Sequence, residues 1–362
     1  MTAQLAQIIA QANIQRLSLI GLAKNVGKTT ATNHLLEMLV GERLYQAEEL
    51  ALTSLGLDGE AVDALTGLPK PRYIPRQGLL VATTTDLLHQ AEIKGVEAER
   101  LLQLPGRTAL GPVIIARIRR AGELAIAGPT LLRDIRFALD RLSAYGARLS
   151  IVDGAINRLG AAMPAVTDAC ILCTGSSAGA TPELVARRTA DVLTRLTVPG
   201  SQWSNAYKNS FPATRLLTFS PPDIASTEIC QIDSAEPADE AAWIARNMRE
   251  RPESVFFLRG AFTEELSRAL LTQLTVTPVS YAAELVVADG TKVFCHSAVL
   301  QRLAARGLQV RVAEPVRVLA LTINPYTPEY MCTPRRLLEA LVKELPTGHP
   351  PIIDVVAGIA SL

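Results

Sequence analysis

The chain has 362 residues, of which 48% are hydrophobic, and its 36 Lys and Arg residues nearly balance its 35 Asp and Glu residues. This length exceeds one ordinary core, so we expect two domains. The near-zero net charge argues against a nucleic-acid or membrane partner recruited by bulk charge, and we expect neither. No uninterrupted apolar run reaches the roughly 18 residues that a membrane helix needs. The N-terminal residues MTAQLAQIIAQANIQRL lack the basic region of a signal peptide, so we expect a cytoplasmic protein.

Strands and helices alternate along the first part of the chain. A helix-like spacing over residues 2–14 precedes the strand LSLIG, a helix that includes Thr30, and the strand ELALTSLG. Turn-forming residues follow over 58–78, and then LLVATTTDLL predicts a strand that runs into a helix. Further strands are predicted at GPVIIARI, ELAIAG, RLSIVDGA and TDACILCTG. Amphipathic helices are predicted after Pro129 and over TPELVARRTADVLTRL.

A polar stretch around residues 220–240 predicts a domain boundary, so we expect domains at 1–225 and 240–362. Beyond this boundary the alternation resumes with SVFFLRGAF, TEELSRALLTQL, AELVVAD, HSAVLQRLAARG, VRVLALTINP and TPRRLLEALVKEL. Such alternation favours an α/β fold with a mostly parallel sheet wrapped by helices. We therefore expect a large nucleotide-binding domain and a smaller C-terminal α/β unit.

The segment LSLIGLAKNVGKTT has the features of a phosphate-binding loop between a strand and a helix. In such a loop, glycines let backbone N–H groups approach phosphate oxygens, and the helix N-terminus adds its partial positive charge. A lysine, here Lys28, reaches the terminal phosphates, and the following hydroxyl joins the Mg²⁺ shell. The predicted nucleotide-binding residues are Gly21, Lys24, Asn25, Val26, Gly27, Lys28, Thr29 and Thr30. The alternative is a chance Gly-Lys-Thr in a strand–helix turn.

The first glycine of this loop is displaced by one residue, to Gly21, from the usual Gly-x4-Gly-Lys-[Ser/Thr] pattern. The resulting Gly-x5-Gly-Lys-Thr-Thr spacing resembles the loop of dethiobiotin synthetases and related ATPases, which implies a P-loop NTPase-type fold. Lys24 resembles the second loop lysine of ParA- and MinD-type ATPases, which reaches the nucleotide of a partner subunit and would imply a homodimer. It lies one position closer to Gly27 than in those proteins, and a solvated loop lysine remains the alternative.

Acidic residues after two other predicted strands are candidates for the metal and for the attacking water. Asp153 ends the apolar run LSIVD at the carboxyl edge where ligands of open α/β sheets bind, so we expect it to hold Mg²⁺ together with Thr29. An Asp-Gly turn is the alternative. Asp58 and Glu60 follow the second strand, where an acid could position water, although LDGE could equally be a loop. Asp168 is a weaker candidate that could simply begin its strand.

Other catalytic or metal-binding patterns are sparse. Cys170 and Cys173 form a lone CxxC in an apolar strand, where residues three apart point to opposite faces, so we expect ordinary buried thiols. The four histidines show no paired metal spacing. The guanine-reading Asn-Lys-x-Asp box is absent, which favours ATP over GTP as the nucleotide.

Several separated segments together resemble a known family. These segments are GLAKNVGKTTATNHLLE, LTSLGLDGEAVDALTGLPKPR, GLLVATT, LSIVDGAINRLGAAMPAVTDACILCTG and LTINPYTPE. They are similar, in the same order, to the ATPase subunit of the reactivase associated with lysine 5,6-aminomutase, whose relatives occur in ornithine aminomutase gene clusters. The resemblance implies an ATP-driven helper that uses ATP and Mg²⁺ to release damaged cobalamin from an aminomutase client, together with a companion subunit.

Residue roles follow from that resemblance. It implies that Lys28 and Thr29 hold nucleotide and Mg²⁺, that Asp153 anchors the metal, and that Asp58 orients the attacking water. The runs Lys70–Arg72 and DGAINR, which ends at Arg158, would move with nucleotide state. The rival interpretations are an ATP-dependent ligase of the dethiobiotin synthetase type and a non-enzymatic nucleotide switch or metallochaperone.

Overall fold

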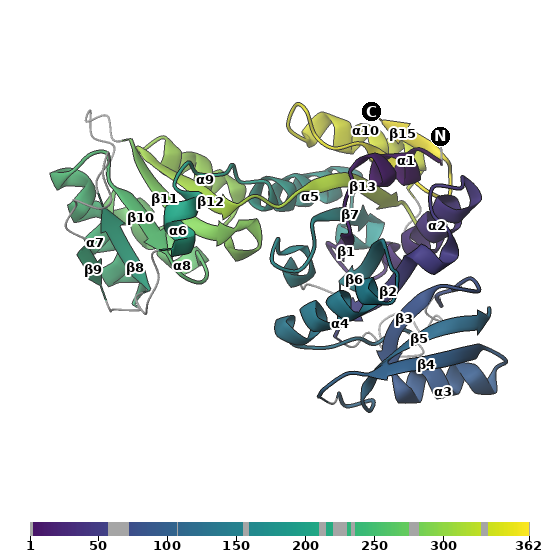
Figure 1. Cartoon of the computed structure of the whole chain (residues 1–362). Coiled ribbons are helices and arrows are strands. Elements are labelled where there is room, and N and C mark those ends of the chain that lie inside the picture. Colours follow the sequence, from purple (N-terminus) through teal and green to yellow (C-terminus); the bar gives the residue numbers. More distant parts are fainter. Residues whose placement is uncertain are drawn as a thin grey trace. The chain divides into compact units, whose positions relative to one another are not determined.

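In the computed structural model the chain forms two units, and the second is inserted into the first. Unit 1 comprises residues 1–190 and 317–362, and unit 2 comprises residues 191–316. The structure describes residues 3–56, 72–106, 108–154, 159–209, 215–219, 230–232, 236–274, 282–326 and 332–361. Figure 1 shows each unit built from one sheet with helices beside it.

The described residues of unit 1 form a ten-stranded, mostly parallel sheet. Its order is β15-β14-β13-β7-β1-β6-β2-β3-β5-β4, and the strands from β14 to β3 all pair in parallel. Among the described strands, the antiparallel pairs lie at the two ends of this order: β15 pairs with β14, β5 with β3, and β4 with β5. The strands are β1 (Arg16–Gly21), β2 (Leu50–Leu55), β3 (Leu80–Thr84), β4 (Glu97–Gln103), β5 (Val113–Arg120), β6 (Leu149–Gly154), β7 (Ala169–Gly175), β13 (Val318–Asn324), β14 (Ile352–Asp354) and β15 (Ile359–Ser361). The predicted α/β class with a mostly parallel, helix-flanked sheet is confirmed.

The core of unit 1 follows the alternation of side chains along its strands. Leu17 and Leu19 of β1 share one buried cluster with Leu5 of α1 and Leu35 of α2, because alternate residues of a strand face the same side. Full burial of one leucine side chain contributes about 1.5–3 kcal/mol. The helices of this unit are α1 (Ala3–Gln11), α2 (Lys28–Gly41), α3 (Thr85–Ile93), α4 (Leu132–Ala144) and α10 (Pro334–Glu344), and α5 (Pro182–Leu196) begins here. Short 3₁₀ turns occur at η1 (Ala47–Glu49), η2 (Leu159–Ala162) and η3 (Ser176–Ala178).

The domain boundary differs from the one predicted at residues 225–240. The last segment of the chain returns to unit 1, because β13 pairs in parallel with β7, for example Leu321 with Leu172. On the side of β7 that faces away from β1, pairing with β13 satisfies the backbone N–H and C=O groups. The smaller α/β unit is therefore internal rather than C-terminal, and 240–362 is not one domain. The polar stretch was misleading because α7 (Pro237–Glu250) begins within it.

Unit 2 has a five-stranded sheet of order β12-β11-β10-β8-β9 among the residues described. Its strands are β8 (Leu216–Phe219), β9 (Cys230–Ile232), β10 (Val255–Leu258), β11 (Ala283–Asp289) and β12 (Leu308–Glu314). Side chains of α7, α8 (Glu264–Gln273) and α9 (Ser297–Ala304) form one buried cluster with alternate strand residues such as Phe256 and Leu285. The intervening residues, including Phe257 and Val286, pack with Tyr207 of α6 (Ser204–Asn209) in a second cluster.

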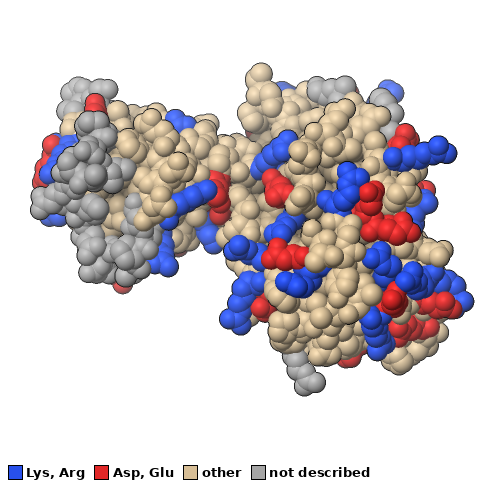
Figure 2. All heavy atoms as spheres, in the orientation of Figure 1, with Lys and Arg blue, Asp and Glu red and all other residues tan. Residues whose placement is uncertain are grey.

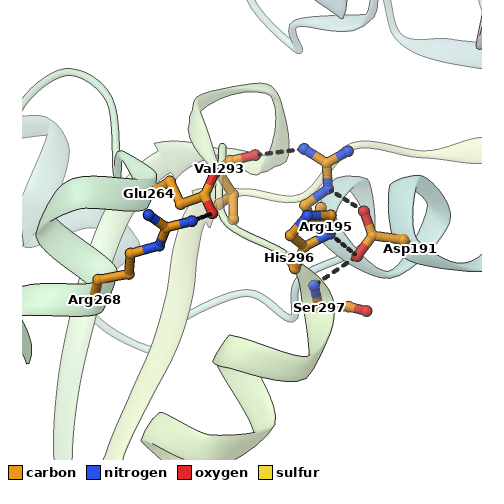
Figure 3. A network of polar contacts seen from close by, with 7 residues as sticks. All are labelled: Asp191, Arg195, Glu264, Arg268, Val293, His296 and Ser297. Atoms are coloured by element: carbon orange, nitrogen blue, oxygen red, sulfur yellow. Dashed lines mark hydrogen bonds and ion pairs between the residues drawn. The ribbon is translucent and has the colours of Figure 1, made fainter. Parts of the chain in front are cut away.

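A polar network joins the end of α5 to the start of α9 within unit 2 (Figure 3). The Asp191 carboxylate accepts the Ser297 N–H at 2.7 Å and lies 3.2 Å from Arg195 Nε. The exposed His296 ring contributes Nδ1 at 3.5 Å from the same carboxylate. Asp191 thereby supplies the acceptor that the first turn of α9 needs, since His296 makes no side-chain cap.

The first sheet differs from the sequence prediction at two places. ELAIAG, residues 123–128, is not a strand, although Leu124 forms one isolated bridge with Tyr73. Side chains at neighbouring strand ends satisfy its backbone instead: Gly128 N donates to Ser54 Oγ at 2.9 Å, and Ala127 N donates to Thr83 Oγ1 at 3.1 Å. The edge strand β4 was not predicted because its sequence, EAERLLQ, is largely exposed and lacks alternation.

The distribution of charged side chains and the lengths of the helices agree with the balanced charge and the short apolar runs of the sequence. Figure 2 shows basic and acidic side chains interspersed on the visible face rather than gathered by sign. Within the described parts of the chain, every helix is too short or too polar to cross a membrane.

Candidate functional site: the phosphate loop and its neighbours

The loop between β1 and α2 presents backbone N–H groups at the carboxyl edge of the sheet. Gly27 precedes the helix in the left-handed region, with φ 83°, and no side chain caps α2. Leu22 N donates to Cys173 O at 3.0 Å, and Ala31 N donates to Gly27 O at 2.9 Å. Between these bonds, the N–H groups of residues 27–30 donate to no acceptor in the described parts of the chain. They are the donors that a helix N-terminus offers to an anion.

Lys28 folds back over the end of β1, and Gly21 makes room for it. The lysine is buried, with only 7% of its surface exposed. A Cβ atom on Gly21 would lie 3.2 Å from Lys28 Nζ and 2.8 Å from Val26 Cγ2. A side chain at this displaced position would therefore crowd both Val26 and Lys28, which glycine avoids.

Two segments distant in sequence hold the outside of the loop. Asn324, the last residue of β13, donates from Nδ2 to Asn25 O at 2.8 Å. A Cβ atom added to Gly27 would lie 3.2 Å from the Cβ atom of Asn324, so the two residues are closely packed. Ser177 of η3 donates from Oγ to Lys24 O at 2.7 Å. The loop conformation thus depends on β13 and on the end of β7 as well as on its own glycines.

Asp153 lies at the end of β6, the strand beside β1, and is buried with 7% exposed. The register pairs it with Leu19 of β1 on one side and Ser54 of β2 on the other. The hydroxyl of Tyr73 donates a hydrogen bond to Asp153 Oδ2. Asp153 therefore lies level with Leu19, two residues before Gly21 at the end of β1, and its role as a metal ligand stays a prediction.

The two cysteines of the CxxC are buried thiols on opposite faces of β7, as predicted. Cys173 belongs to the core cluster that contains α1 and α2, and Cys170 does not. Burial raises the pKa of Cys173 to about 11, while nearby Lys28 lowers that pKa and Asp153 raises it. Burial also raises the pKa of Cys170. Lys28 and Asp153 therefore both lie close enough to Cys173 to affect its charge.

Because only the thiolate alkylates readily, we expect Cys170 and Cys173 to resist iodoacetamide at pH 8 in the folded protein. With a pKa of about 11, roughly one Cys173 in a thousand is ionised at that pH. Mass spectrometry after alkylation with and without guanidinium measures this directly. Cys332, which lines a cavity, is the internal comparison and should react first. Equal labelling of Cys173 and Cys332 in the folded state would contradict the assignment.

A cavity of about 490 Å³ adjoins the phosphate loop on the side of β13. Its lining includes Gly27, Thr30, Asn324, Tyr326, Thr333 and Val356. Tyr326 and Val356 are 61% and 79% exposed, so apolar surface is available at the cavity wall. Asp354 is not a free acid there, because its Oδ1 accepts the N–H groups of Val356 and Ala357 at 2.9 and 2.8 Å.

The structure brings the predicted loop residues and Asp153 to one edge of the sheet. Thr29 and Thr30 stand in the first turn of α2, half-buried, and Lys24 is half-buried on the loop. Asp168 lies at the opposite edge, where its Oδ2 accepts the N–H groups of Gln15 and Arg16 at 2.8 and 2.9 Å. It supports the start of β1 and is not near the site. The predicted residues Asp58, Glu60, Lys70 and Arg158 lie outside the described residues.

Sequence reasoning missed four side chains around this site: Asn33, Tyr73, Ser177 and Asn324. Tyr73 directly follows the Lys70–Arg72 run, and Asn324 ends a predicted strand, LTIN. A polar residue at a strand's carboxyl end was a usable signal for Asn324. Nothing local to Tyr73 or Asn33 marks them, because their partners are far away in sequence.

No protein-family model, no curated protein and no solved structure matches this chain in the comparisons with known proteins.

Proposed function

We propose that the chain binds ATP with Mg²⁺ at the loop formed by residues 21–30 and hydrolyses it. The observation that carries this proposal is the placement of Lys28, buried over Gly21 at the end of β1, with Asp153 at the end of the adjacent strand. A lysine without a carboxylate beside it could serve many anions, but this pair, with the N–H groups of Gly27–Thr30, suits a triphosphate and its metal.

Each residue would have a distinct task. The N–H groups of Gly27–Thr30 would bind phosphate oxygens, and Lys28 would neutralise charge on the terminal phosphates. Thr29 and Asp153 supply the oxygen ligands that Mg²⁺ prefers, directly or through water. When bound, the ion would screen the phosphates and stabilise the charge that develops as the terminal phosphoryl group leaves. Asp58 stays the predicted water-positioning residue.

The cavity beside the loop supports a nucleotide rather than inorganic phosphate as the ligand. Its lining includes Gly27 and Thr30 of the loop together with Asn324, Tyr326 and Val356, so it offers space beside the loop for the rest of a nucleotide. Its apolar walls and volume of about 490 Å³ suit a planar base. The absence of a guanine-reading box leads us to propose ATP.

For the biological role we propose an ATP-driven reactivase subunit for a cobalamin-dependent aminomutase, on the basis of the segment resemblance described above. The rival is a ligase of the dethiobiotin synthetase type, which the shared Gly-x5-Gly-Lys-Thr-Thr spacing favours. The proposal also includes a companion reactivase subunit and a homodimer of this chain.

The test is ATP hydrolysis by the purified protein, with GTP and Mg²⁺-free buffer as comparisons. We expect slow, Mg²⁺-dependent ATP turnover that exceeds GTP turnover. Stimulation by a cobalamin-inactivated aminomutase supports the helper role, whereas stimulation by a small carboxylic acid alone supports the ligase. Absence of nucleotide binding altogether removes both.

A further inference from the structure

Resting on the proposed function, we infer that Tyr73 is a positioning residue that orients Asp153 for magnesium, and that Asn33 of the phosphate-loop helix holds Tyr73 in place. This assigns a role to a segment, residues 72–74, that the nucleotide-binding pattern does not include.

The contact between Tyr73 and Asp153 is enclosed. Both residues are buried, at 6% and 7% exposed, and the phenol donates to Oδ2 of the carboxylate. Because water has little access there, a hydrogen bond to a charged oxygen contributes more than it would at the surface. The phenol therefore selects one rotation of the carboxylate about its side-chain bond.

Tyr73 is itself held from two directions. Asn33, in the second turn of α2, donates from Nδ2 to Arg72 O at 2.8 Å and accepts the Ile74 N–H at 3.2 Å. One amide side chain thus hydrogen-bonds the backbone of the residues on both sides of the tyrosine. The tyrosine's own backbone exchanges two hydrogen bonds with Leu124, at 3.0 and 2.9 Å.

The arrangement matters because Mg²⁺ demands near-ideal octahedral geometry and tolerates a misplaced ligand poorly. Side chains that hydrogen-bond a metal-ligating carboxylate typically change metal affinity by about 10–100-fold when they are removed. The helix that begins at the phosphate loop would thereby also fix the metal carboxylate, through Asn33 and Tyr73. Nucleotide binding without metal should not depend on this chain of contacts.

The test is Tyr73→Phe, which removes the hydroxyl and keeps the ring. We expect the Mg²⁺ concentration that half-saturates binding of a fluorescent ATP analogue to rise about 10–100-fold. Binding of the same analogue in EDTA should be unchanged. Tyr45→Phe is the matched control, because Tyr45 is also buried in unit 1 but stacks on Arg148, at 5.4 Å from the ring centre. This control should leave the Mg²⁺ midpoint unchanged.

Asn33→Ala provides an independent variant, expected to shift the Mg²⁺ midpoint in the same direction by a smaller factor. In an Asp153→Asn background, Tyr73→Phe should add no further shift, since the partner charge is already gone. An unchanged midpoint in both Tyr73→Phe and Asn33→Ala overturns the inference while leaving nucleotide binding in place. If the wild-type protein binds no nucleotide under any condition, the inference falls together with the proposed function.

Discussion

Lys28→Ala is expected to abolish ATP turnover and to weaken nucleotide binding about 100-fold, since a hydrogen bond to a charged group contributes about 1.5–3 kcal/mol and this lysine would contact two phosphates. The lysine is buried over Gly21 beside the end of β1. Because alanine is smaller and uncharged, the fold of unit 1 should tolerate the replacement of Lys28. Binding by isothermal titration and turnover by phosphate release give the two readouts.

Lys94→Ala is the matched control, because Lys94 is an exposed lysine at the end of α3, away from the loop. It should change neither affinity nor turnover. Unchanged hydrolysis in Lys28→Ala, with a folded protein, would falsify the assignment of the loop as the nucleotide site.

Gly21→Ala is expected to lower nucleotide affinity at least tenfold, although the added group is only a methyl. That methyl would lie 2.8 Å from Val26 Cγ2 and 3.3 Å from Lys28 Cδ, so the loop and its lysine must shift. Overpacking of this kind typically costs about 1–3 kcal/mol, which corresponds to about a tenfold or larger change if it falls on the binding conformation. Nucleotide titration together with a thermal melt separates loss of binding from loss of stability.

The control is Gly41→Ala, at the end of α2, where an added Cβ has no neighbour within 4 Å. Alanine favours a helix over glycine by up to about 1 kcal/mol, so this variant should be as stable as the wild type or more so, with unchanged affinity. Equal affinity of the Gly21 and Gly41 variants would show that the displaced glycine has no role in the loop.

Much of the local structure could be predicted because its causes lie within a few residues. LSLIG and RLSIVDGA are apolar runs of strand length, and α2 carries its buried residues at helical spacing, so β1, β6 and α2 were predicted from pattern alone. Thr-Pro pairs begin both α5 and α10. The prediction failed for residues 123–128, whose apolar pattern matches a strand but whose backbone is satisfied by Ser54 and Thr83.

By itself, the sequence determined the α/β class, the glycine-containing loop between β1 and α2 that we propose to bind phosphate, and the acid at the end of β6, since all three depend on short-range pattern and residue chemistry. Only the tertiary structure decided that β13 returns to pair with β7, that Asn324 supports the loop, and that Tyr73 reaches Asp153. The reason is physical. The residue pattern of a strand indicates how deeply the strand is buried, but any open strand edge can satisfy its backbone hydrogen bonds, so the pattern does not specify the neighbouring strand. Side chains that contact each other from distant parts of the sequence likewise produce no local sequence pattern.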